Sequence, residues 1–292
     1  MGKMHADEVD IDIPLVRRLL AAQFSQWADL PIERFPSPGT VNAVYRLGDH
    51  LAVRLPLVSW GVEDVEKEHH WLPRLAPVLD VPIPAVLGKG SPAAGYPWPW
   101  SVCRWLDGEN PDPARLAGPE RLAKDLAGFV AALRRVDLRG APRAYRAGPL
   151  TEVDAGARTA ISELEGLIDT RAATAAWEAA VAAPEWPGPP VWLHSDLMPG
   201  NLLVEDGRLT GVIDFATAGV GDPACDLIPA WNLLPPPARE VFRSALDVDE
   251  ATWARGRGWA LAMALIQLPY YLHTNPAIAA NARHTIDAVL TG

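Results

Sequence analysis

The segment VWLHSDLMPGNLLV (191–204) constrains this chain most, because it places a polar cluster between two apolar runs. The cluster contains His194, Asp196 and Asn201, with four residues between the Asp and the Asn. Short apolar runs bounded by turn-forming residues are typical of buried strands. The sequence therefore predicts a loop that holds three polar side chains close together between two strands.

A second acidic residue, Asp214, follows this loop after a predicted hairpin. The segment NLLVEDGRLTGVIDF (201–215) reads as two short strands joined by a turn with Asp206-Gly207 at its tip. Protein-kinase-like phosphoryl transfer uses the same order of residues: an Asp that orients the attacking hydroxyl, then an Asn and a second Asp. The last two supply hard oxygen ligands for magnesium on a triphosphate.

The two segments LHSDLMPGNLLV (193–204) and GVIDFATAGVGDPACDL (211–227) resemble the aminoglycoside phosphotransferase family, a group of kinase-like small-molecule phosphotransferases. Ser195 stands where the family has Gly, and this narrows the φ range available beside Asp196. The other motif positions match: His194, Asp196, Asn201, Asp214, Gly221, Asp222, Pro223 and Asp226.

The resemblance implies an α+β, two-lobe protein-kinase-like fold. A small antiparallel β-rich lobe, 1–106, would bind the nucleotide, and a larger, mainly helical lobe, 107–292, would carry the catalytic loop and the acceptor site. The order of predicted strands and helices along the chain agrees with this two-lobe arrangement. Strands are predicted at 32–36, 41–47, 51–55, 82–88 and 100–106, and helices at 14–24, 62–76, 119–135, 152–170, 173–183 and over most of 224–290.

The family pattern also implies roles for the matching residues. Asp196 would be the catalytic base or hydroxyl-orienting group, and Asn201 and Asp214 would bind Mg²⁺. His194 would brace the loop without reacting. Asp226 would support the loop by accepting hydrogen bonds from backbone N–H groups.

The resemblance in the first hundred residues is weaker. GTVNAVYRLG (39–48), with Thr40 and Asn42, resembles the nucleotide-positioning loop. In LAVRLP (51–56) the phosphate-binding cation would be Arg54 where Lys is commoner, and Arg can bind phosphate through two hydrogen bonds.

The acidic partner of that cation is expected on the helix that follows. We assign it to Glu68, with Glu63 and Glu66 as competitors that helical phase does not separate. SVCRWLDGE (101–109) resembles the segment that joins the lobes. The nucleotide base would meet its backbone at Arg104, Trp105 and Leu106.

The resemblance implies an Mg²⁺-dependent O-phosphotransferase that moves the γ-phosphoryl of ATP or GTP to a hydroxyl of an aminoglycoside or similar antibiotic. Asp222, Trp231 and the acidic stretch 247–250 are candidate acceptor contacts. Two alternatives remain. The acceptor could be a macrolide, a sugar or an amino alcohol, or the chain could be a nucleotide-binding pseudokinase.

Local interpretations of the same residues also remain open. Asp196 and Asn201 could each cap the loop, since Asp and Asn side chains often bond nearby backbone. Arg54 and Glu68 could form an ordinary surface pair, and Trp231 could be a core residue.

Composition narrows the partners. The net charge of −10 and pI of about 5.2 disfavour a nucleic-acid partner and suit a small cationic one. Cys103 and Cys225 form no C-x-x-C pair and are predicted to be buried free thiols in a reducing compartment. The apolar run at 259–272 is too short to span a bilayer. We expect a soluble cytoplasmic protein, monomeric or dimeric, with no membrane partner.

Overall fold

The computed structural model describes residues 8–36 and 41–292 and divides the chain into two compact units. The first unit contains the chain up to Pro77, then Pro82–Asp107 and Gly211–Ala216. The second contains Val78–Val81, Gly108–Thr210 and Thr217–Gly292. Asp214 thus belongs to the first unit, whereas Asp196 and Asn201 belong to the second.

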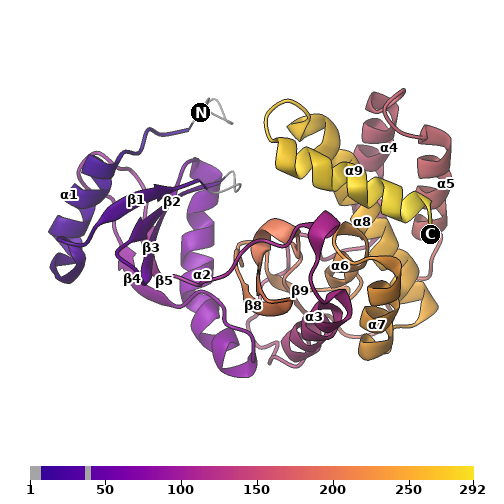
Figure 1. Cartoon of the computed structure of the whole chain (residues 1–292), viewed down its shortest axis with the longest axis horizontal. Helices are drawn as coiled ribbons and strands as arrows, with labels where there is room; N and C mark the ends of the chain where they lie inside the picture. The colour runs from indigo at the N-terminus through magenta and orange to yellow at the C-terminus, as the bar shows by residue number, and fades with distance from the viewer. Residues whose placement is uncertain (1–7, 37–40) are drawn as a thin grey trace. The chain divides into compact units, whose positions relative to one another are not determined.

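An antiparallel five-stranded sheet forms the first unit, with strand order β1-β2-β3-β5-β4 (Figure 1). Two α-helices, α1 and α2, accompany it, with short 3-10 helices at Ser25–Trp27, Ser59–Gly61 and Ala76–Val78. The elements are β1 (Ile32–Phe35), β2 (Asn42–Leu47), β3 (Leu51–Pro56), β4 (Val86–Gly90), β5 (Trp100–Arg104), α1 (Ile13–Gln23) and α2 (Val62–Leu75).

Side-chain alternation on β3 places Arg54 away from the main core of this unit. Val53 and Leu55 are fully buried and belong to the apolar cluster that includes Leu19 and Leu20 of α1. Because successive strand residues point to opposite faces, Arg54 points to the other face. The buried side of α2 includes Val65, Glu68, Leu72 and Leu75, and it meets Arg54 there through Glu68.

The predicted strand at 82–88 begins only at Val86 in the structure. Pro82 and Pro84 carry no backbone N–H and cannot donate to a sheet ladder. The predicted strand at 100–106 likewise ends at Arg104.

Helices dominate the second unit, and α8 packs against α4, α5 and α9 (Figure 1). None of the helices among the described residues is long and apolar enough to cross a membrane. The helices are α3 (Pro119–Leu133), α4 (Asp154–Glu163), α5 (Thr170–Val181), α6 (Pro229–Asn232), α7 (Pro236–Leu246), α8 (Glu250–Tyr271) and α9 (Pro276–Leu290), with 3-10 helices at Pro113–Arg115, Leu150–Val153, Pro199–Asn201 and Cys225–Leu227.

Two short strand pairs carry the motif segments of the second unit. Strand β6 (Val191–Leu193) pairs antiparallel with β9 (Gly219–Gly221), and β7 (Leu202–Glu205) pairs with β8 (Arg208–Val212). The β7–β8 turn has positive φ at both Asp206 and Gly207, which is the geometry of a type I′ hairpin turn.

Strand β9 was not predicted from the sequence, because Gly-Val-Gly has low strand propensity. Its glycines are needed for close approach to the chain at 142–147. A Cβ on Gly219 would lie 2.5 Å from the Ala144 backbone nitrogen, and one on Gly221 would lie 2.6 Å from Ala147 Cα. The segment 142–147 is therefore packed directly on β9.

Candidate active site

The loop after β6 is held by a buried carboxylate. Asp226 Oδ2 accepts a hydrogen bond from the His194 backbone nitrogen at 2.8 Å, and Oδ1 accepts one from the Ser195 nitrogen at 2.7 Å. Asp226 is fully buried. Burial raises the pKa of its carboxyl, and His194 and the two backbone hydrogen bonds oppose that shift. The start of the loop is thus fixed to the segment that follows β9.

Ser195 has a left-handed backbone conformation, with φ of 62°. This conformation favours glycine, and a side chain there is strained. The Ser195 hydroxyl donates to the Thr217 carbonyl at 2.9 Å, and the Thr217 hydroxyl donates to the His194 carbonyl at 2.9 Å. Ser195 thus gains a hydrogen bond that glycine lacks.

The carboxylate of Asp196 is bound at both oxygens. Asn201 Nδ2 donates to Asp196 Oδ2 at 2.9 Å and to the Asp196 carbonyl at 2.9 Å. Arg146 Nη1 donates to Asp196 Oδ1 at 3.2 Å. His194 Nδ1 accepts from the Asp196 backbone nitrogen at 3.3 Å, so this imidazole contacts the loop backbone from within the core. Asp196 remains partly exposed, with 22% of its side chain accessible.

The Asn201 amide fits the donor set of a magnesium site. Its nitrogen is directed at Asp196, which leaves Oδ1 as the atom available to a metal. Asp214 provides carboxylate oxygens with 37% of its side chain exposed. Amide and carboxylate oxygens are the hard ligands that Mg²⁺ prefers.

Arg54, Glu68 and Asp214 form an ionic cluster in the first unit, with Glu68 buried and Asp214 partly exposed. Arg54 Nη1 lies 2.6 Å from Glu68 Oε2, and Arg54 Nη2 lies 3.7 Å from Asp214 Oδ1. Burial alone lowers the pKa of the Arg54 guanidinium, but the Glu68 and Asp214 carboxylates raise it above its ordinary value. The guanidinium is therefore a permanent cation. The pair is not a surface pair, because Glu68 is only 4% exposed.

Helix α2 also holds the backbone that follows Asp214. Glu68 Oε1 accepts from the Phe215 nitrogen at 3.2 Å, and Lys67 Nζ donates to the Ala216 carbonyl at 2.7 Å. Asp214 itself has φ of 64°. Of the two competitors for the acidic partner, Glu63 is exposed and Glu66 pairs with Lys89.

A further carboxyl, Asp64, lies one helical turn before Glu68. Burial raises the pKa of Asp64 to about 6, and the negative charges of Glu68 and Asp214 add to the shift. Lys67 and Arg54 oppose it. The pKa of Asp64 is therefore well above that of an ordinary aspartate.

The residues expected near the nucleotide base end β5 and follow it. Arg104 is exposed, and Trp105 and Leu106 are half-buried. The Trp105 backbone nitrogen donates to the His50 carbonyl at 2.8 Å, and the centroid of the Trp105 ring lies 5.0 Å from that of the Phe35 ring. Asn42 begins β2. Thr40 lies outside the described residues.

Of the residues expected at the acceptor, Trp231 and Asp222 are buried, whereas Asp247, Asp249 and Glu250 are exposed. Trp231 is 1% exposed, and its ring packs on Trp253 with centroids 4.6 Å apart. Asp222 is 8% exposed and makes two hydrogen bonds to Arg255, at 2.7 and 3.2 Å. In the stretch 247–250, Asp249 caps α8 by accepting from the Thr252 nitrogen at 2.8 Å.

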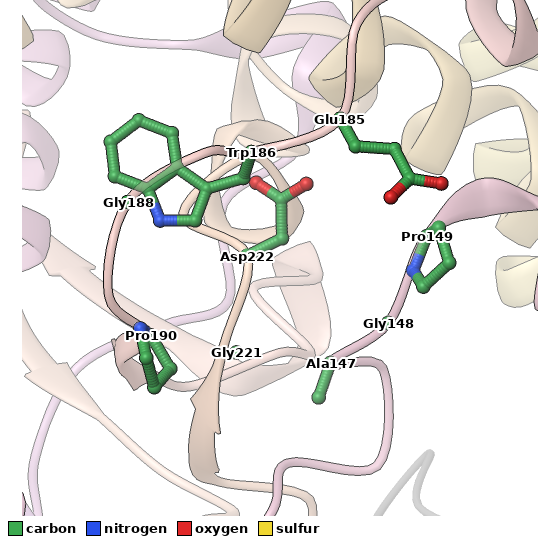
Figure 2. A pocket seen from close by; sticks show the side chains of 9 residues that line it. All are labelled: Ala147, Gly148, Pro149, Glu185, Trp186, Gly188, Pro190, Gly221 and Asp222. Atoms are coloured by element: carbon green, nitrogen blue, oxygen red, sulfur yellow. The ribbon is translucent and has the colours of Figure 1, made fainter.

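Asp222 also borders a pocket of about 200 Å³ (Figure 2). Figure 2 shows the pocket between the chain at 147–149 and the chain at 185–190, with the Asp222 carboxylate between the Trp186 ring and the Glu185 carboxylate in this view. Arg255 compensates the charge of the Asp222 carboxylate. Glu185 is therefore the acidic side chain of this pocket that forms no ion pair with the described residues.

Sequence reasoning missed Arg146 and Asn110. Arg146 lies between α3 and α4, fifty residues before its partner Asp196. Asn110 Nδ2 donates to the Leu202 carbonyl at 2.8 Å and to the Gly200 carbonyl at 3.0 Å. Neither residue belongs to a sequence motif, and only the fold brings them to the loop.

A family model described as phosphotransferase enzyme family matches residues 32–259. The chain belongs to this family. Among curated proteins, the uncharacterized protein YcbJ of Bacillus subtilis (strain 168) is 36% identical over 76 residues. That alignment covers 26% of this chain and 23% of YcbJ, so the chain matches under a quarter of that relative.

Solved structures give the fold. The GDP and kanamycin complex of APH(2″)-IIIa superposes with a TM-score of 0.74 at 19% identity, covering 94% of this chain and 98% of that one. The gentamicin complex of APH(2″)-IIa gives 0.64 at 16%, covering 97% and 99%. The macrolide 2′-phosphotransferase MphH of Brachybacterium faecium gives 0.61 at 25%, covering 95% and 98%. The predicted α+β kinase-like fold is confirmed.

Proposed function

We propose that this phosphotransferase-family protein transfers the γ-phosphoryl of ATP or GTP to a hydroxyl of an aminoglycoside or similar antibiotic. The observation that carries the proposal is that the Asp196 carboxylate is both fixed in position and accessible. This carboxylate is partly exposed, and both oxygens are fixed by donors on a loop anchored by Asp226. A fixed, accessible carboxylate suits a group that orients an acceptor hydroxyl and receives its proton.

The other roles follow from the same chemistry. Asn201 and Asp214 would bind Mg²⁺, which would neutralise charge on the phosphates. Arg54, held by Glu68, would bind a nucleotide phosphate, with Thr40 and Asn42 near the phosphates and Arg104, Trp105 and Leu106 near the base. Structural neighbours crystallised with GDP or ADP support a nucleotide donor.

A macrolide acceptor is the second candidate. The macrolide phosphotransferase MphH is 25% identical to this chain, whereas the aminoglycoside phosphotransferases compared with it are 16 to 20% identical. Aminoglycosides are supported by the higher TM-score of 0.74. Asp222, which borders the pocket of Figure 2, and Trp231 remain candidate acceptor contacts, and Trp231 would be reached only if its surroundings open.

The test is a mass-spectrometric screen for phosphorylated products, with magnesium and ATP or GTP, across aminoglycosides, macrolides, sugars and amino alcohols. We expect Asp196→Asn to stay folded and to lose about 10³-fold in turnover, within the range for general acid–base groups. Asp206→Asn is the matched control, because Asp206 is exposed at the tip of the β7–β8 turn and Asn tolerates positive φ.

Two results would contradict the proposal. Near-wild-type turnover by Asp196→Asn would exclude Asp196 as the base. Magnesium-dependent nucleotide binding without any phosphorylated product would instead support a pseudokinase.

A further inference from the structure

Arg146 is the only cationic side chain that contacts the Asp196 carboxylate among the described residues. Its Nη1 lies 3.2 Å from Asp196 Oδ1 and donates to the Ser195 carbonyl at 2.9 Å. One nitrogen thus connects the carboxylate with the backbone of the preceding residue. The side chains of Arg146 and Asp196 are 20% and 22% exposed, so water screens this pair only in part.

The backbone on both sides of Arg146 is fixed to β9 and the residues next to it. The Ala144 nitrogen donates to the Val220 carbonyl at 3.1 Å, and the Tyr145 nitrogen donates to the Thr217 carbonyl at 3.0 Å. Beyond Arg146, the Ala147 carbonyl accepts from the Asp222 nitrogen at 3.1 Å. The backbone that carries the Arg146 side chain is therefore held on both sides by β9 and the residues next to it, which supports the placement of the guanidinium.

Tyr145 further restricts the guanidinium. The Arg146 guanidinium carbon lies 5.3 Å from the centre of the Tyr145 ring, within the range of a cation–π contact. The ring is 76% exposed. An aromatic surface and a cation are thus presented together beside the catalytic carboxylate.

We propose that Arg146 orients Asp196 for proton transfer and, by compensating its charge, weakens the preference of the acceptor site for polycations. The proposal rests on the function proposed above, in which Asp196 is the base. Asn201 fixes one carboxylate oxygen and Arg146 the other, so together they set the plane of the carboxylate. An acceptor ammonium next to the reacting hydroxyl meets the charge of Arg146 as well as that of Asp196.

Arg146→Met removes the hydrogen bonds and the charge but keeps much of the side-chain volume. We expect kcat to fall about 10- to 100-fold, the equivalent of one lost charge-assisted hydrogen bond. The KM for magnesium-nucleotide should change less than about twofold. Arg143→Met is the matched control, because Arg143 lies on the same segment but forms an exposed pair with Glu152, and it should keep wild-type kinetics.

The charge effect gives a second readout that loss of structure alone does not produce. Kanamycin carries several ammonium groups and erythromycin carries one amine. In Arg146→Met, an uncompensated carboxylate faces the acceptor. The ratio of the erythromycin Kd to the kanamycin Kd should therefore rise by about 3- to 10-fold, because the Coulomb attraction of the uncompensated carboxylate acts on more ammonium groups in kanamycin. Arg146→Lys should keep the wild-type ratio, because it keeps the charge, while recovering only part of kcat.

The kinetics are measured on the full chain with each of the two acceptors. Nucleotide hydrolysis, in which water is the acceptor, is measured in the same way without them. The acceptor Kd values come from titration calorimetry, which needs no turnover. If thermal melting shows that Arg146→Met is unfolded, Arg146→Lys carries the test, and a wild-type kcat in Arg146→Lys would overturn the orienting role. An unchanged Kd ratio in folded Arg146→Met would overturn the charge role.

The Asp196→Asn background separates this inference from the proposed function. If Arg146 acts through Asp196, Arg146→Met adds no further loss to Asp196→Asn. Near-wild-type turnover in Asp196→Asn contradicts the proposed function itself. Loss of turnover in Asp196→Asn together with wild-type behaviour of Arg146→Met contradicts only the role of Arg146.

Discussion

The strained Ser195 in the loop after β6 leads to a quantitative prediction. Ser195 has φ of 62°, a conformation that costs a non-glycine residue about 1 to 2 kcal/mol. Its hydroxyl bond to the Thr217 carbonyl returns about 1 kcal/mol. Replacement by glycine removes both contributions and also raises the entropy of the unfolded chain, at a cost of about 0.4 to 1 kcal/mol.

These contributions nearly cancel for Ser195→Gly and do not cancel for Ser195→Ala. Alanine keeps the backbone strain and loses the hydrogen bond, so we expect a loss of about 1 kcal/mol in unfolding free energy. Glycine should stay within about 0.5 kcal/mol of the wild type. The comparison uses urea denaturation followed by far-UV circular dichroism, with each transition fitted separately because the chain has two units.

A Ser195→Ala variant that is more stable than Ser195→Gly would contradict this expectation. That order would mean that the left-handed conformation is not strained at this position. A loss of more than about 2 kcal/mol in Ser195→Gly would mean that the hydroxyl bond contributes far more than an ordinary hydrogen bond.

Three further predictions concern carboxylates. Asp64→Asn should raise the unfolding midpoint at pH 8 and leave it unchanged at pH 4. The pKa of Asp64 is raised to about 6 in the folded state, so its contribution to stability is present below the unfolded pKa and is lost as pH rises through 6. An equal effect of the substitution at both pH values would contradict this prediction. Asp226→Ala should cost about 3 kcal/mol in urea denaturation, because two buried N–H groups lose their acceptor, and a cost below about 1 kcal/mol would show that water replaces it. Glu68→Gln should cost about 3 kcal/mol by breaking a buried ion pair, while the exposed control Glu63→Gln should stay within about 0.5 kcal/mol; equal losses would refute this.

Much of the fold could be predicted because it depends on local patterns. The β7–β8 hairpin follows from Asp206-Gly207, and α1 follows from apolar spacing with Asp12 as its cap and Pro14 in its first turn. The helix expected at 152–170 is shorter, since α4 spans Asp154–Glu163 and the chain then turns at Gly166, where φ is 79°.

The contacts that orient the candidate site were less predictable. Asp196, Asn201 and Asp226 could be found because their spacing is a motif. Arg146 could not, because its position depends on how the 142–147 segment packs on β9, a contact between distant parts of the sequence. The left-handed φ of Ser195 is also a tertiary property, although the replacement of the family glycine pointed to it.

The six residues Gly211–Ala216 have a consequence for how this chain is made. They belong to the first unit, although about a hundred residues of the second unit precede them. Phe215 provides a donor to Glu68, and Ala216 provides the acceptor for Lys67. During synthesis, Glu68 and Lys67 of the first unit therefore cannot form these hydrogen bonds until the ribosome has released residue 216. A fragment ending at Asp107 leaves these partners missing, and a peptide containing residues 211–216, added in trans, is the natural complement for it.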